Sequence, residues 1–554
     1  MASLVSSLKD KYEKNPGKVF CKFIAGNVDE EITYQSLLEK SAMYAVHFKM
    51  RNVTKGSPVL IVLKHSPHLF YSFIGAMMVG AIPSILPFPS EKQDLLLYRA
   101  SLEKLAARIQ AKSIITYKEN IQEIRAITNH LNIDIVASDD MAGKAAPFWG
   151  EDNGTDGFAF LQHSSGTTGL QKGVALTHAA VLNQIENYSA AIKLDNSDKI
   201  VSWLPLYHDM GLIACFMMPL VKGVPIIMMD TFEWVNKPQI LFEHIEKNKA
   251  TLCWLPNFAF NFLANCVDTE TNKYNLKGMK AFIDCSEACK LHSFDVFCDS
   301  FKAYGIRREM LQTCYAMAEN VFGISQSEIG RVVQVDYVLR IPFIEECHAI
   351  KVEAGSDCLC FLSCGSAIPN TEVSISDDNR NELSERHVGE VRIRSTSLFS
   401  GYFRLPDETA RVLEHGWFYT GDLGYIAEGQ LYITGRKKDL IIVNGKNYYA
   451  HDVEFIVNHV QGIKKGRAVA VGIHNSKIGS EEVVLICETT ISPGLHRNLI
   501  REIKRRISEG LNLSVKDVYL VPLKWIVKTT SGKISRNENK KKYLKEKFGA
   551  DAEN

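Results

Sequence analysis

Hydrophobic runs of two kinds alternate along the first half of this chain. Between Ser41 and Leu86 an amphipathic run is followed by the apolar stretch Pro58–Leu63 and then by a second apolar run. Helix-like and strand-like segments continue to alternate to about residue 260. Such alternation predicts an α/β fold whose layers are built on largely parallel sheets.

One apolar run is long enough to be considered as a membrane span. Leu69–Phe88 holds twenty uncharged residues, which is about the length that a bilayer requires. Its two glycines and two prolines favour instead a buried helix that ends near Val79-Gly80 and a short buried strand around Ile82 to Leu86. The segment Met1–Phe20 lacks the apolar core of a signal peptide. We therefore expect no transmembrane segment.

The composition is typical of a globular protein with two or more domains. The chain has 554 residues, of which 46% are hydrophobic and 23% charged, and its net charge is +1. This balance argues against binding to nucleic acid or to an anionic membrane. Thirteen scattered cysteines fit a reducing, cytoplasmic compartment. The closest groups, Cys285/Cys289 and Cys358/Cys360/Cys364, lack zinc-site spacing and predict buried thiols.

The stretch His163–Gly173 is rich in glycine and hydroxyl side chains. Its glycines let backbone N–H groups approach an anion, and its hydroxyls and lysine add donors suited to phosphate oxygens. The spacing differs from that of a Walker A loop. The chemistry that fits is the binding of nucleotide phosphates, and the alternative is a turn between two strands. The candidate ligands are Ser164, Ser165, Gly166, Thr167, Thr168, Gly169 and Lys172.

The same stretch resembles the signature loop of the adenylate-forming superfamily, which includes acyl-CoA synthetases, luciferases, adenylation domains and fatty acyl-AMP ligases. Gln171 stands where proline commonly precedes the lysine. The resemblance extends from about residue 30 to 540, through at least six motifs in the family's order. It implies ATP and Mg²⁺, and a large domain that is followed by a small mobile one.

The segment Trp203–Ile213 reads as a strand end running into a helix, which is a usual place for ligand contacts. His208 is a candidate for meeting a substrate carboxylate or the leaving pyrophosphate, and the alternative is a histidine satisfied by nearby backbone. The segment resembles the corresponding part of fatty acyl-AMP ligases. Amino-acid-activating domains normally carry a Phe-Asp-x-Ser pattern there, although Asp209 leaves an opening for an amine-bearing substrate.

The aromatic stretch Trp254–Leu263 has two interpretations. Apolar ligands need apolar walls, so the stretch is a candidate lining for an acyl tunnel. Without the family resemblance, plain core is the favoured interpretation. The candidate acyl-binding residues are Trp254, Phe258 and Phe260.

Two further motifs resemble the adenine side of the family's nucleotide site. Ile283–Ala288 looks like the adenine-side loop with its usual glycine and proline replaced, which implies roles for Ser286 and Glu287. Thr313–Glu319 resembles the Tyr-Gly-x-x-Glu motif, with Ala316 in place of the glycine. The expected roles are stacking of Tyr315 on adenine, proximity of Thr313 and Ala316 to the nucleotide, and Mg²⁺ binding by Glu319.

The remaining nucleotide motifs surround the expected hinge. Asp422 lies on a Gly-flanked turn and is suited to accept hydrogen bonds from both ribose hydroxyls. Arg436 can hold ribose or phosphate through its planar guanidinium. Asp439 matches the superfamily hinge, which implies an AMP-binding domain over residues 1–438 and a lid domain over residues 439–554.

The lid domain is expected to be α+β. Ala468–Val471 and Val483–Cys487 read as strands, and Leu499–Glu509 as a basic amphipathic helix. Near its end Lys533 lies in a Thr/Ser/Gly loop, which can swing a side chain into a site. Lys533 matches the superfamily's catalytic lysine, whose ammonium bridges the substrate carboxylate and the α-phosphate. The alternative for an isolated residue is a solvated loop lysine.

An extra segment at about residues 332–354 looks like the insertion that marks fatty acyl-AMP ligases. In that family it packs against the large domain and hinders the movement needed for thiolation by CoA. The alternative is a tolerated surface insertion.

The implied reaction is the ATP-dependent conversion of a fatty acid to acyl-AMP with release of pyrophosphate. The acyl group then passes to a separate acyl carrier protein, or to a polyketide or non-ribosomal peptide synthase. The alternatives are a fatty acyl-CoA synthetase, a non-catalytic acyl or nucleotide sensor, and amino-acid adenylation. The presence of Lys533, Asp422 and Glu319 argues against the sensor.

Overall fold

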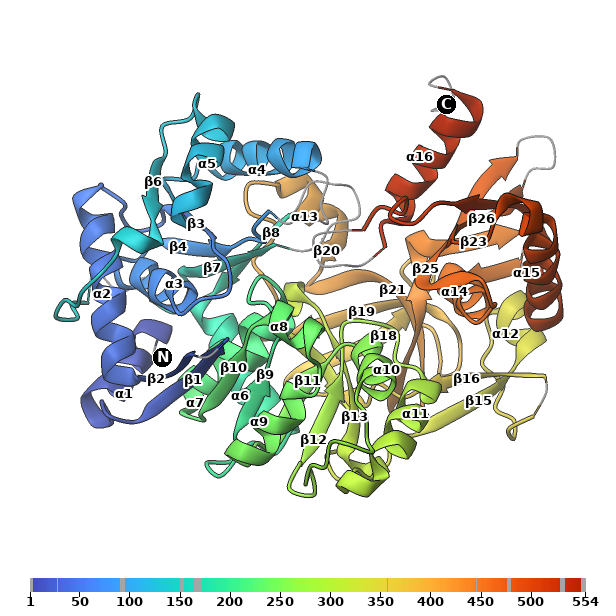
Figure 1. Ribbon diagram of the computed structural model, residues 1–554, viewed down its shortest axis with the longest axis horizontal. Helices are drawn as coiled ribbons and strands as arrows, with labels where there is room; N and C mark the ends of the chain where they lie inside the picture. Colours follow the sequence, from blue (N-terminus) through green and yellow to red (C-terminus); the bar gives the residue numbers. More distant parts are fainter. Residues whose placement is uncertain are drawn as a thin grey trace.

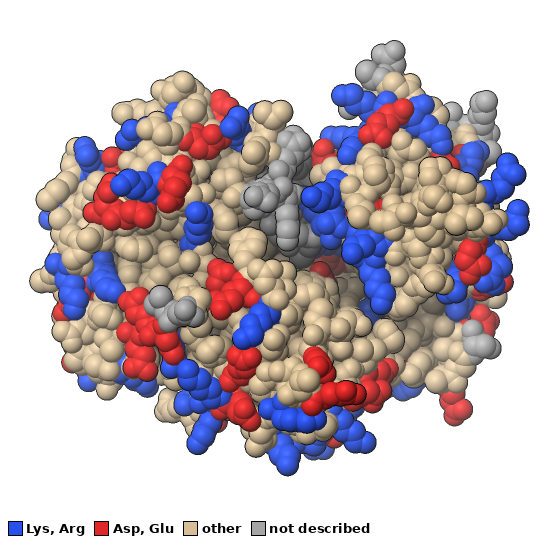
Figure 2. Space-filling model, in the orientation of Figure 1, with Lys and Arg blue, Asp and Glu red and all other residues tan. Residues whose placement is uncertain are grey.

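The computed structural model describes residues 3–26, 28–89, 95–149, 154–163, 172–355, 357–444, 446–475, 480–528 and 534–549. Within these ranges a large lobe of sheets and covering helices carries a smaller lobe that holds the C-terminal elements (Figure 1). Figure 2 shows a hollow between parts of the two lobes, with Lys and Arg side chains gathered on the small lobe beside it. The predicted α/β fold with a smaller α+β part is confirmed.

The larger parallel sheet forms the base of the large lobe. Its strands run in the order β17-β14-β13-β12-β11-β9-β10-β1-β2, and the strands from β13 to β1 are parallel. The edges are antiparallel. The strands are β1 (Val19–Ala25), β2 (Val28–Thr33), β9 (Ile200–Ser202), β10 (Ile226–Met229), β11 (Leu252–Leu255), β12 (Ala281–Asp284), β13 (Leu311–Ala316), β14 (Gly323–Gln326) and β17 (Ser366–Ala367).

A second parallel sheet has the order β4-β3-β5-β6. Every residue of β3 is buried, as expected for a parallel strand that is covered on both faces. Its strands are β3 (Pro58–Val62), β4 (Ile82–Ile85), β5 (Ser113–Thr116) and β6 (Asp134–Ala137). The antiparallel pair of β7 (Phe158–His163) and β8 (Gly173–Thr177) lies beside this sheet.

The helix and strand predicted within Leu69–Phe88 are both present. The buried helix α3 ends at Met78, and β4 follows it. In the described part of the chain, no helix is both long and apolar enough to cross a membrane. The helices of the large lobe are α1 (Leu4–Lys14), α2 (Tyr34–Met50), α3 (His68–Met78), α4 (Leu95–Ile109), α5 (Ile121–Thr128), α6 (His178–Ala191), α7 (Met218–Lys222), α8 (Thr231–Asn236), α9 (Ile240–Asn248), α10 (Asn257–Cys266), α11 (Leu291–Phe301) and α13 (Pro406–Val412).

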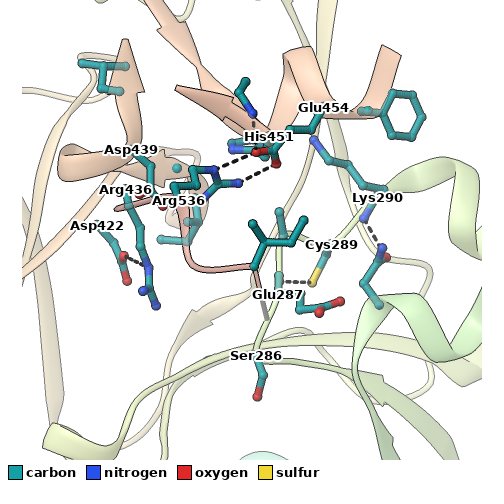
Figure 3. A pocket seen from close by; sticks show the side chains of 18 of the residues that line it. Ser286, Glu287, Cys289, Lys290, Asp422, Arg436, Asp439, His451, Glu454 and Arg536 are labelled. Atoms are coloured by element: carbon teal, nitrogen blue, oxygen red, sulfur yellow. Dashed lines mark hydrogen bonds and ion pairs between the residues drawn. The ribbon is translucent and has the colours of Figure 1, made fainter. Parts of the chain in front are cut away.

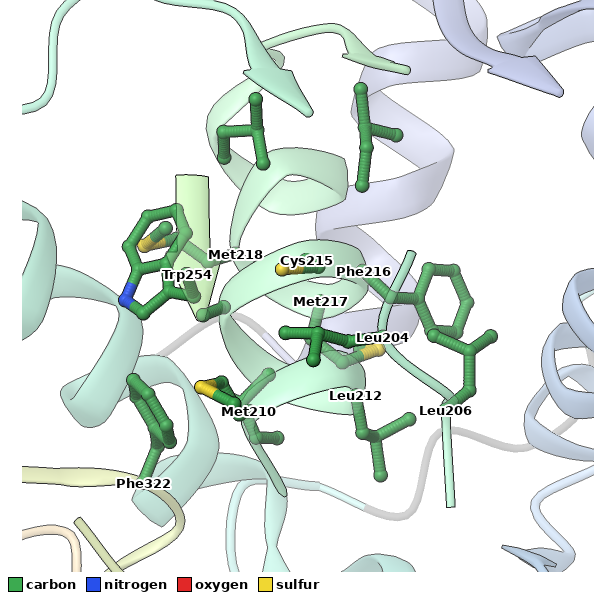
Figure 4. Close-up of a cluster of buried hydrophobic side chains, with 14 of the residues drawn as sticks. Leu204, Leu206, Met210, Leu212, Cys215, Phe216, Met217, Met218, Trp254 and Phe322 are labelled. Atoms are coloured by element: carbon green, nitrogen blue, oxygen red, sulfur yellow. The ribbon is translucent and has the colours of Figure 1, made fainter. Parts of the chain in front are cut away.

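A π-helical segment, Met210–Met217, lies at the centre of the main core. All eight of its residues are buried, and Figure 4 shows apolar side chains around it, with Trp254 and Phe322 on one side. Gly211 makes this arrangement possible, because a Cβ there would lie 2.3 Å from the carbonyl oxygen of Pro205. π-helical turns are rare and often accompany functional sites.

A mostly antiparallel region joins the two lobes. It consists of β18 (Thr371–Ser376), β19 (Gly389–Ser395), β20 (Leu413–Glu414), β21 (Trp417–Ala427) and β22 (Gln430–Arg436). The hairpin of β23 (Leu440–Val443) and β24 (Lys446–Tyr449) follows directly. This hairpin precedes the elements of the small lobe along the chain.

The small lobe packs three helices on a three-stranded sheet. Its order is β25-β26-β27, from β25 (Ile463–Asn475), β26 (Ser480–Thr489) and β27 (Val515–Val521). The helices are α14 (Ala450–Asn458), α15 (His496–Leu511) and α16 (Arg536–Phe548). Helix α15 buries Leu499, Ile503, Ile507 and Leu511, which recur every fourth residue along one face.

The segment predicted as an insertion folds as a unit that extends beyond residue 354. Strand β15 (Val335–Leu339) leads into helix α12 (Arg340–Glu346), and the antiparallel partner β16 (Cys358–Leu362) returns. Val338, Phe343, Ile344 and Ala349 share one buried apolar cluster with residues of α14, α15 and β24. The segment is therefore packed between the two lobes.

Candidate active site

A cavity of about 840 Å³ lies where the two lobes meet. Its walls come from the loop after β12, from β13, from the end of β22, and from α14 and the start of α16 (Figure 3). This cavity brings together eight of the predicted site residues: Phe258, Ser286, Glu287, Tyr315, Ala316, Asp422, Arg436 and Asp439.

Tyr315, Asp422 and Arg436 form one polar cluster in this cavity. The Tyr315 hydroxyl donates to Oδ2 of Asp422 at 2.7 Å, and Nε of Arg436 lies 3.3 Å from Oδ1. The register of the β21–β22 hairpin places Asp422 opposite Arg436. The Asp422 carboxylate raises the pKa of Arg436. Burial, with the charge of Asp422, raises the pKa of Tyr315 well above its usual range.

The loop after β12 forms another wall. Ser286 has a φ of 74°, a conformation that is more usual for glycine. The Glu287 carboxylate accepts a hydrogen bond from the Phe258 backbone N–H at 3.2 Å, which joins this loop to α10. Asp284, at the end of β12, is fully buried. Burial raises the pKa of its carboxyl well above the usual range.

Glu319 and Tyr402 line a second cavity of about 300 Å³, and Lys172 lies against the ring of Tyr402. The Tyr402 hydroxyl donates to Oε1 of Glu319 at 2.9 Å. Nζ of Lys172 lies 4.6 Å from the centre of the same tyrosine ring and 2.7 Å from Oε2 of Glu408. Tyr402 therefore connects the lysine and the carboxylate, which are far apart in sequence.

The backbone beside Glu319 is strained. Val321 has φ 62° and ψ −52°, and the Phe322 N–H donates to the Asn320 carbonyl at 2.6 Å. These values describe a γ-turn with positive φ at a β-branched residue, which costs about 1–3 kcal/mol. Such strain clusters at functional sites, which supports a functional role for the adjacent carboxylate.

Burial raises the pKa of Glu319, and the charge of Asp209 adds to this effect. A divalent cation would oppose that shift. No group of three or more His, Cys, Asp or Glu side chains in the described residues can hold a metal ion. This single carboxylate fits Mg²⁺ that takes its other ligands from ATP phosphates and water.

His208 and Asp209 lie at the predicted junction between β9 and the π-helical segment. The imidazole of His208 is half-buried, and its ring centre lies 4.8 Å from that of Tyr207. The Asp209 carboxylate caps the following turn by accepting from the Met210 N–H at 2.8 Å. His208 does not line either cavity described above.

The aromatic residues predicted to bind an acyl chain separate into two groups. Phe258 is 47% exposed and lines the large cavity. Trp254 and Phe260 are fully buried: the indole of Trp254 donates to the Tyr188 hydroxyl at 2.9 Å, and Phe260 packs on Phe294 and Phe297. The core interpretation thus describes where these two residues lie, and their acyl-binding role stays a prediction.

Three other predictions concern Thr313, the glycine-rich loop and Lys533. Thr313 is fully buried, and its hydroxyl donates to the Ser363 carbonyl at 2.6 Å, so it supports the site from behind. Ser164, Ser165, Gly166, Thr167, Thr168 and Gly169 lie outside the described residues, as does Lys533. Their roles stay predictions.

An ion-pair network surrounds the expected hinge. Arg536 lies 2.6 Å from the carboxylates of both Asp439 and Glu454 (Figure 3). Lys290 lies 3.1 Å from Asp452, which ties the loop before α11 to α14. His451 is 3.3 Å from the same carboxylate.

Sequence reasoning did not identify Arg536, Glu454, Lys290 or Asp452. The positions of two of these residues indicate that they need partners: Arg536 begins α16, and Lys290 immediately precedes α11. A cation at a helix N-terminus is unfavourable beside the positive end of the helix dipole. Such a residue needs carboxylate partners, and those partners come from elements that are distant in sequence.

Comparisons with known proteins agree with this geometry. Residues 8–403 match the AMP-binding enzyme family. A Caulobacter vibrioides protein that is provisionally named an acyl-CoA synthetase is 28% identical over 539 residues, which cover 95% of this chain and 92% of that protein. A medium-chain-fatty-acid–[acyl-carrier-protein] ligase of Moorena producens is 26% identical, covering 93% of this chain and 90% of that one.

A structure solved in a study of fatty acyl-adenylate ligases from E. coli and L. pneumophila is 26% identical and superposes with a TM-score of 0.90. The match covers 99% of this chain and 98% of that one. A fatty acyl-adenylate ligase from L. pneumophila, solved with acyl adenylate and pyrophosphate, is also 26% identical, with a TM-score of 0.74 and coverage of 98% and 96%. The chain therefore belongs to the AMP-binding enzyme family and is an adenylate-forming ligase.

Proposed function

We propose that this ligase activates a fatty acid to acyl-AMP, releases pyrophosphate and delivers the acyl group to a separate carrier protein or synthase. The observation that carries the proposal is the cluster of Tyr315, Asp422 and Arg436 in a large cavity between the lobes. The fatty acid and the carrier protein come from the names of the relatives.

The nucleotide occupies the large cavity in this proposal. Asp422 accepts hydrogen bonds from the ribose hydroxyls, and Arg436 holds ribose or phosphate. Tyr315 stacks on adenine, with Ser286, Glu287 and Ala316 beside the base and Thr313 behind it. The support for these roles is that all of these residues except Thr313 line the cavity, although they lie on separate motifs.

The phosphates extend toward the second cavity. Lys172 and the loop Ser164–Gly169 bind phosphate oxygens, and Glu319 holds Mg²⁺. The support is the chain of contacts from Lys172 through Tyr402 to Glu319. When bound, Mg²⁺ neutralises phosphate charge.

The reaction forms one bond and breaks one. A carboxylate oxygen of the fatty acid attacks the α-phosphorus in line, and the bond from that phosphorus to the bridging oxygen of pyrophosphate breaks. His208 meets the substrate carboxylate or the pyrophosphate, and Phe258 lies at the mouth of the acyl path, with Trp254 and Phe260 further along it. Lys533 neutralises the charge that develops between carboxylate and phosphate.

The insertion is the reason to propose a carrier protein as acceptor. Helix α12 shares a buried apolar cluster with the small lobe, and Nη1 of Arg340 donates to the Gly510 carbonyl at 2.6 Å. Such contacts oppose the rotation about Asp439 that thiolation by CoA needs. A second candidate, a fatty acyl-CoA synthetase, is favoured by the provisional name of the Caulobacter relative.

Product analysis tests the proposal. Purified protein is incubated with ATP, Mg²⁺ and fatty acids of graded length, with and without CoA, and the products are resolved by mass spectrometry. We expect acyl-AMP that persists when CoA is present, and no acyl-AMP from Lys533→Ala, which still binds ATP. Rapid conversion to acyl-CoA would favour the second candidate, and adenylation at the wild-type rate by the variant would contradict the role of Lys533.

A further inference from the structure

Thiols gather on one side of the nucleotide cavity. Cys289, Cys314, Cys360 and Cys364 all line it, and Cys285 is buried immediately beside Ser286. They come from the loop after β12, from β13, from β16 and from the turn after β16. Cysteines that are scattered in sequence are thus collected at the site where ATP is proposed to bind.

Cys289 and Cys364 form a pair within this group. The Cys289 thiol lies within hydrogen-bonding reach of the Cys364 sulfur, although 75 positions separate them in sequence. The same thiol lies 3.8 Å from the carbonyl oxygens of Asp284 and Glu287, which hold it at the loop beside the cavity (Figure 3). Cys364 is fixed from the other side, where its backbone N–H donates to the Leu431 carbonyl at 2.7 Å.

Exposure distinguishes Cys289 and Cys364 from a second pair of cysteines, Cys285 and Cys314. Cys289 is half-buried and Cys364 is 7% exposed, and both face the cavity. Cys285 and Cys314 directly follow the paired residues Asp284 and Thr313 on adjacent parallel strands, and are 0% and 2% exposed. A small oxidant in the cavity therefore reaches Cys289 and Cys364 before it reaches Cys285.

The charge state favours reactivity at Cys364. The hydrogen bond from Cys289 lowers the pKa of Cys364, and the same bond, with burial, raises the pKa of Cys289. A thiol with a lowered pKa is the better nucleophile near neutral pH, and its partner is placed to complete a disulfide.

We propose that Cys289 and Cys364 are a modification site at which a hydroperoxide forms a disulfide across the wall of the nucleotide cavity. The Cys364 thiolate attacks one oxygen of hydrogen peroxide, the O–O bond breaks, and the released hydroxide takes a proton to give water and a sulfenic acid. The Cys289 sulfur then attacks the sulfenic sulfur and loses its proton, and a second water leaves with the hydroxyl oxygen. Two thiols lose two electrons in total, and the peroxide gains them.

The disulfide changes the wall that carries Ser286 and Glu287. It ties their loop to the turn after β16, while Lys290 in the same loop pairs with Asp452 of the small lobe. The cross-link therefore acts on both the nucleotide wall and the contact between the lobes. Bound nucleotide slows the oxidation, because peroxide enters through the cavity that the nucleotide fills. This last point depends on the proposed function, whereas disulfide formation does not.

The test combines peptide mapping with activity. The full-length protein is treated with hydrogen peroxide, with and without ATP and Mg²⁺, its free thiols are blocked, and its peptides are identified by mass spectrometry without reduction. We expect a Cys289–Cys364 cross-linked peptide, slower cross-linking with ATP, and adenylation that falls about tenfold or more and returns with dithiothreitol. For Cys289→Ser and Cys364→Ser, adenylation activity is measured before and after peroxide treatment. Each variant is expected to keep the activity that it had before treatment.

Cys266→Ser is the matched control, because Cys266 is exposed at the end of α10, away from the cavity. It is expected to cross-link and to lose activity as the wild type does. Absence of the Cys289–Cys364 peptide, a cross-link to Cys360 in its place, or serine variants that lose as much activity to peroxide as the wild type does would overturn the proposal. If ATP does not slow the cross-linking, the disulfide proposal still stands, but the result contradicts the proposed nucleotide site.

Discussion

At the scale of single residues, the charged groups of the site are held by one another. Asp422 accepts from the Tyr315 hydroxyl and pairs with Arg436, and Glu319 accepts from Tyr402. A side chain that is fixed in this way is ready to bind a ligand without losing further conformational freedom. Each of these residues therefore has two partners, the protein group that fixes it and the ligand group that it is proposed to bind.

Replacing Asp422 by Asn tests the proposed ribose site. The amide keeps one acceptor for Tyr315 but removes the charge that faces Arg436 and one acceptor for ribose. Because hydrogen bonds to charged groups contribute about 1.5–3 kcal/mol, we expect the KM for ATP to rise about 10- to 100-fold. Steady-state kinetics measures it. Asp268→Asn, at an exposed turn, is the control, and an unchanged KM for ATP in Asp422→Asn would contradict the role.

His451 predicts a pH dependence of stability. Burial lowers its pKa from 6.5 to about 4. The unfolded chain therefore binds more protons between these values, and stability that is present above pH 6.5 is lost as the pH falls toward 4. The loss approaches about 3 kcal/mol for this group. Urea unfolding at pH 7 and at pH 4.5 measures it.

His451→Gln is expected to lose part of the wild-type destabilisation on acidification. His474→Gln is the matched control, because His474 is exposed in the same lobe. If the two variants respond to acid in the same way, the lowered pKa of the partly buried His451 is refuted.

The sequence predicted which candidate residues lie together where a motif places several of them on one strand or turn. Tyr315 and Ala316 end β13, and Asp422 and Arg436 face each other across a hairpin, so local spacing fixed their approach. It left open whether Trp254, Phe258 and Phe260 line a tunnel or lie in the core, and it did not separate the buried Trp254 and Phe260 from the exposed Phe258. Which face of α10 lies on the cavity depends on where α11 and β12 pack. The local sequence pattern of α10 does not predict those positions.

At the scale of elements, helix α12 has two faces with different neighbours. Phe343 is 3% exposed, and its ring centre lies 5.0 Å from that of Phe361 and 6.3 Å from that of Tyr449. Ile341 on the same helix is 57% exposed. The sequence predicted that this segment is an insertion. It did not predict that the segment enters the core of the small lobe, because its apolar residues are too few to show a periodic pattern.

Phe343→Ala tests whether α12 restrains the small lobe. Removing a buried ring is expected to lower the free energy of unfolding by about 3–4 kcal/mol. If the helix opposes rotation about Asp439, the variant also makes more acyl-CoA relative to acyl-AMP. Ile341→Ala is the matched control and should change neither quantity. A destabilised Phe343→Ala with an unchanged product ratio would show that α12 stabilises the fold without restraining the lobe.

At the scale of the whole molecule, charge is unevenly divided. Residues 439–554 carry 20 Lys and Arg against 13 Asp and Glu, whereas residues 1–438 carry 44 against 50. The net charge of +1 thus combines +7 on one part with −6 on the other. Opposite charges favour contact between the lobes at low salt. Composition of the whole chain conceals this division, which explains why net charge revealed little about the fold.

Arg536 is the cation whose removal we expect to lower the stability of the protein most. It pairs with Asp439 at the expected hinge and with the buried Glu454, so Arg536→Ala leaves a buried carboxylate without its partner. We expect a loss of about 2–3 kcal/mol in the free energy of unfolding, reduced by the partial exposure of the arginine, together with slower adenylation. Denaturant unfolding and a pyrophosphate-release assay measure these.

Arg506→Ala removes an exposed arginine that is paired with Glu502 on α15 and serves as the control. It should leave both readouts unchanged, because exposed ion pairs contribute little. Equal effects of the two variants would mean that Arg536 contributes nothing beyond a surface charge.

The shared packing of α12 determines which parts of the chain can be exchanged between enzymes. A truncation at residue 438 would leave Phe343 and Ile344 without the small-lobe part of their apolar cluster, including Tyr449, and an uncovered apolar face promotes aggregation. A chimera that replaced residues 439–554 alone would pair a foreign lobe with an α12 surface shaped for another partner. The transferable module is therefore discontinuous in sequence: it comprises the segment from β15 to β16 together with the C-terminal lobe.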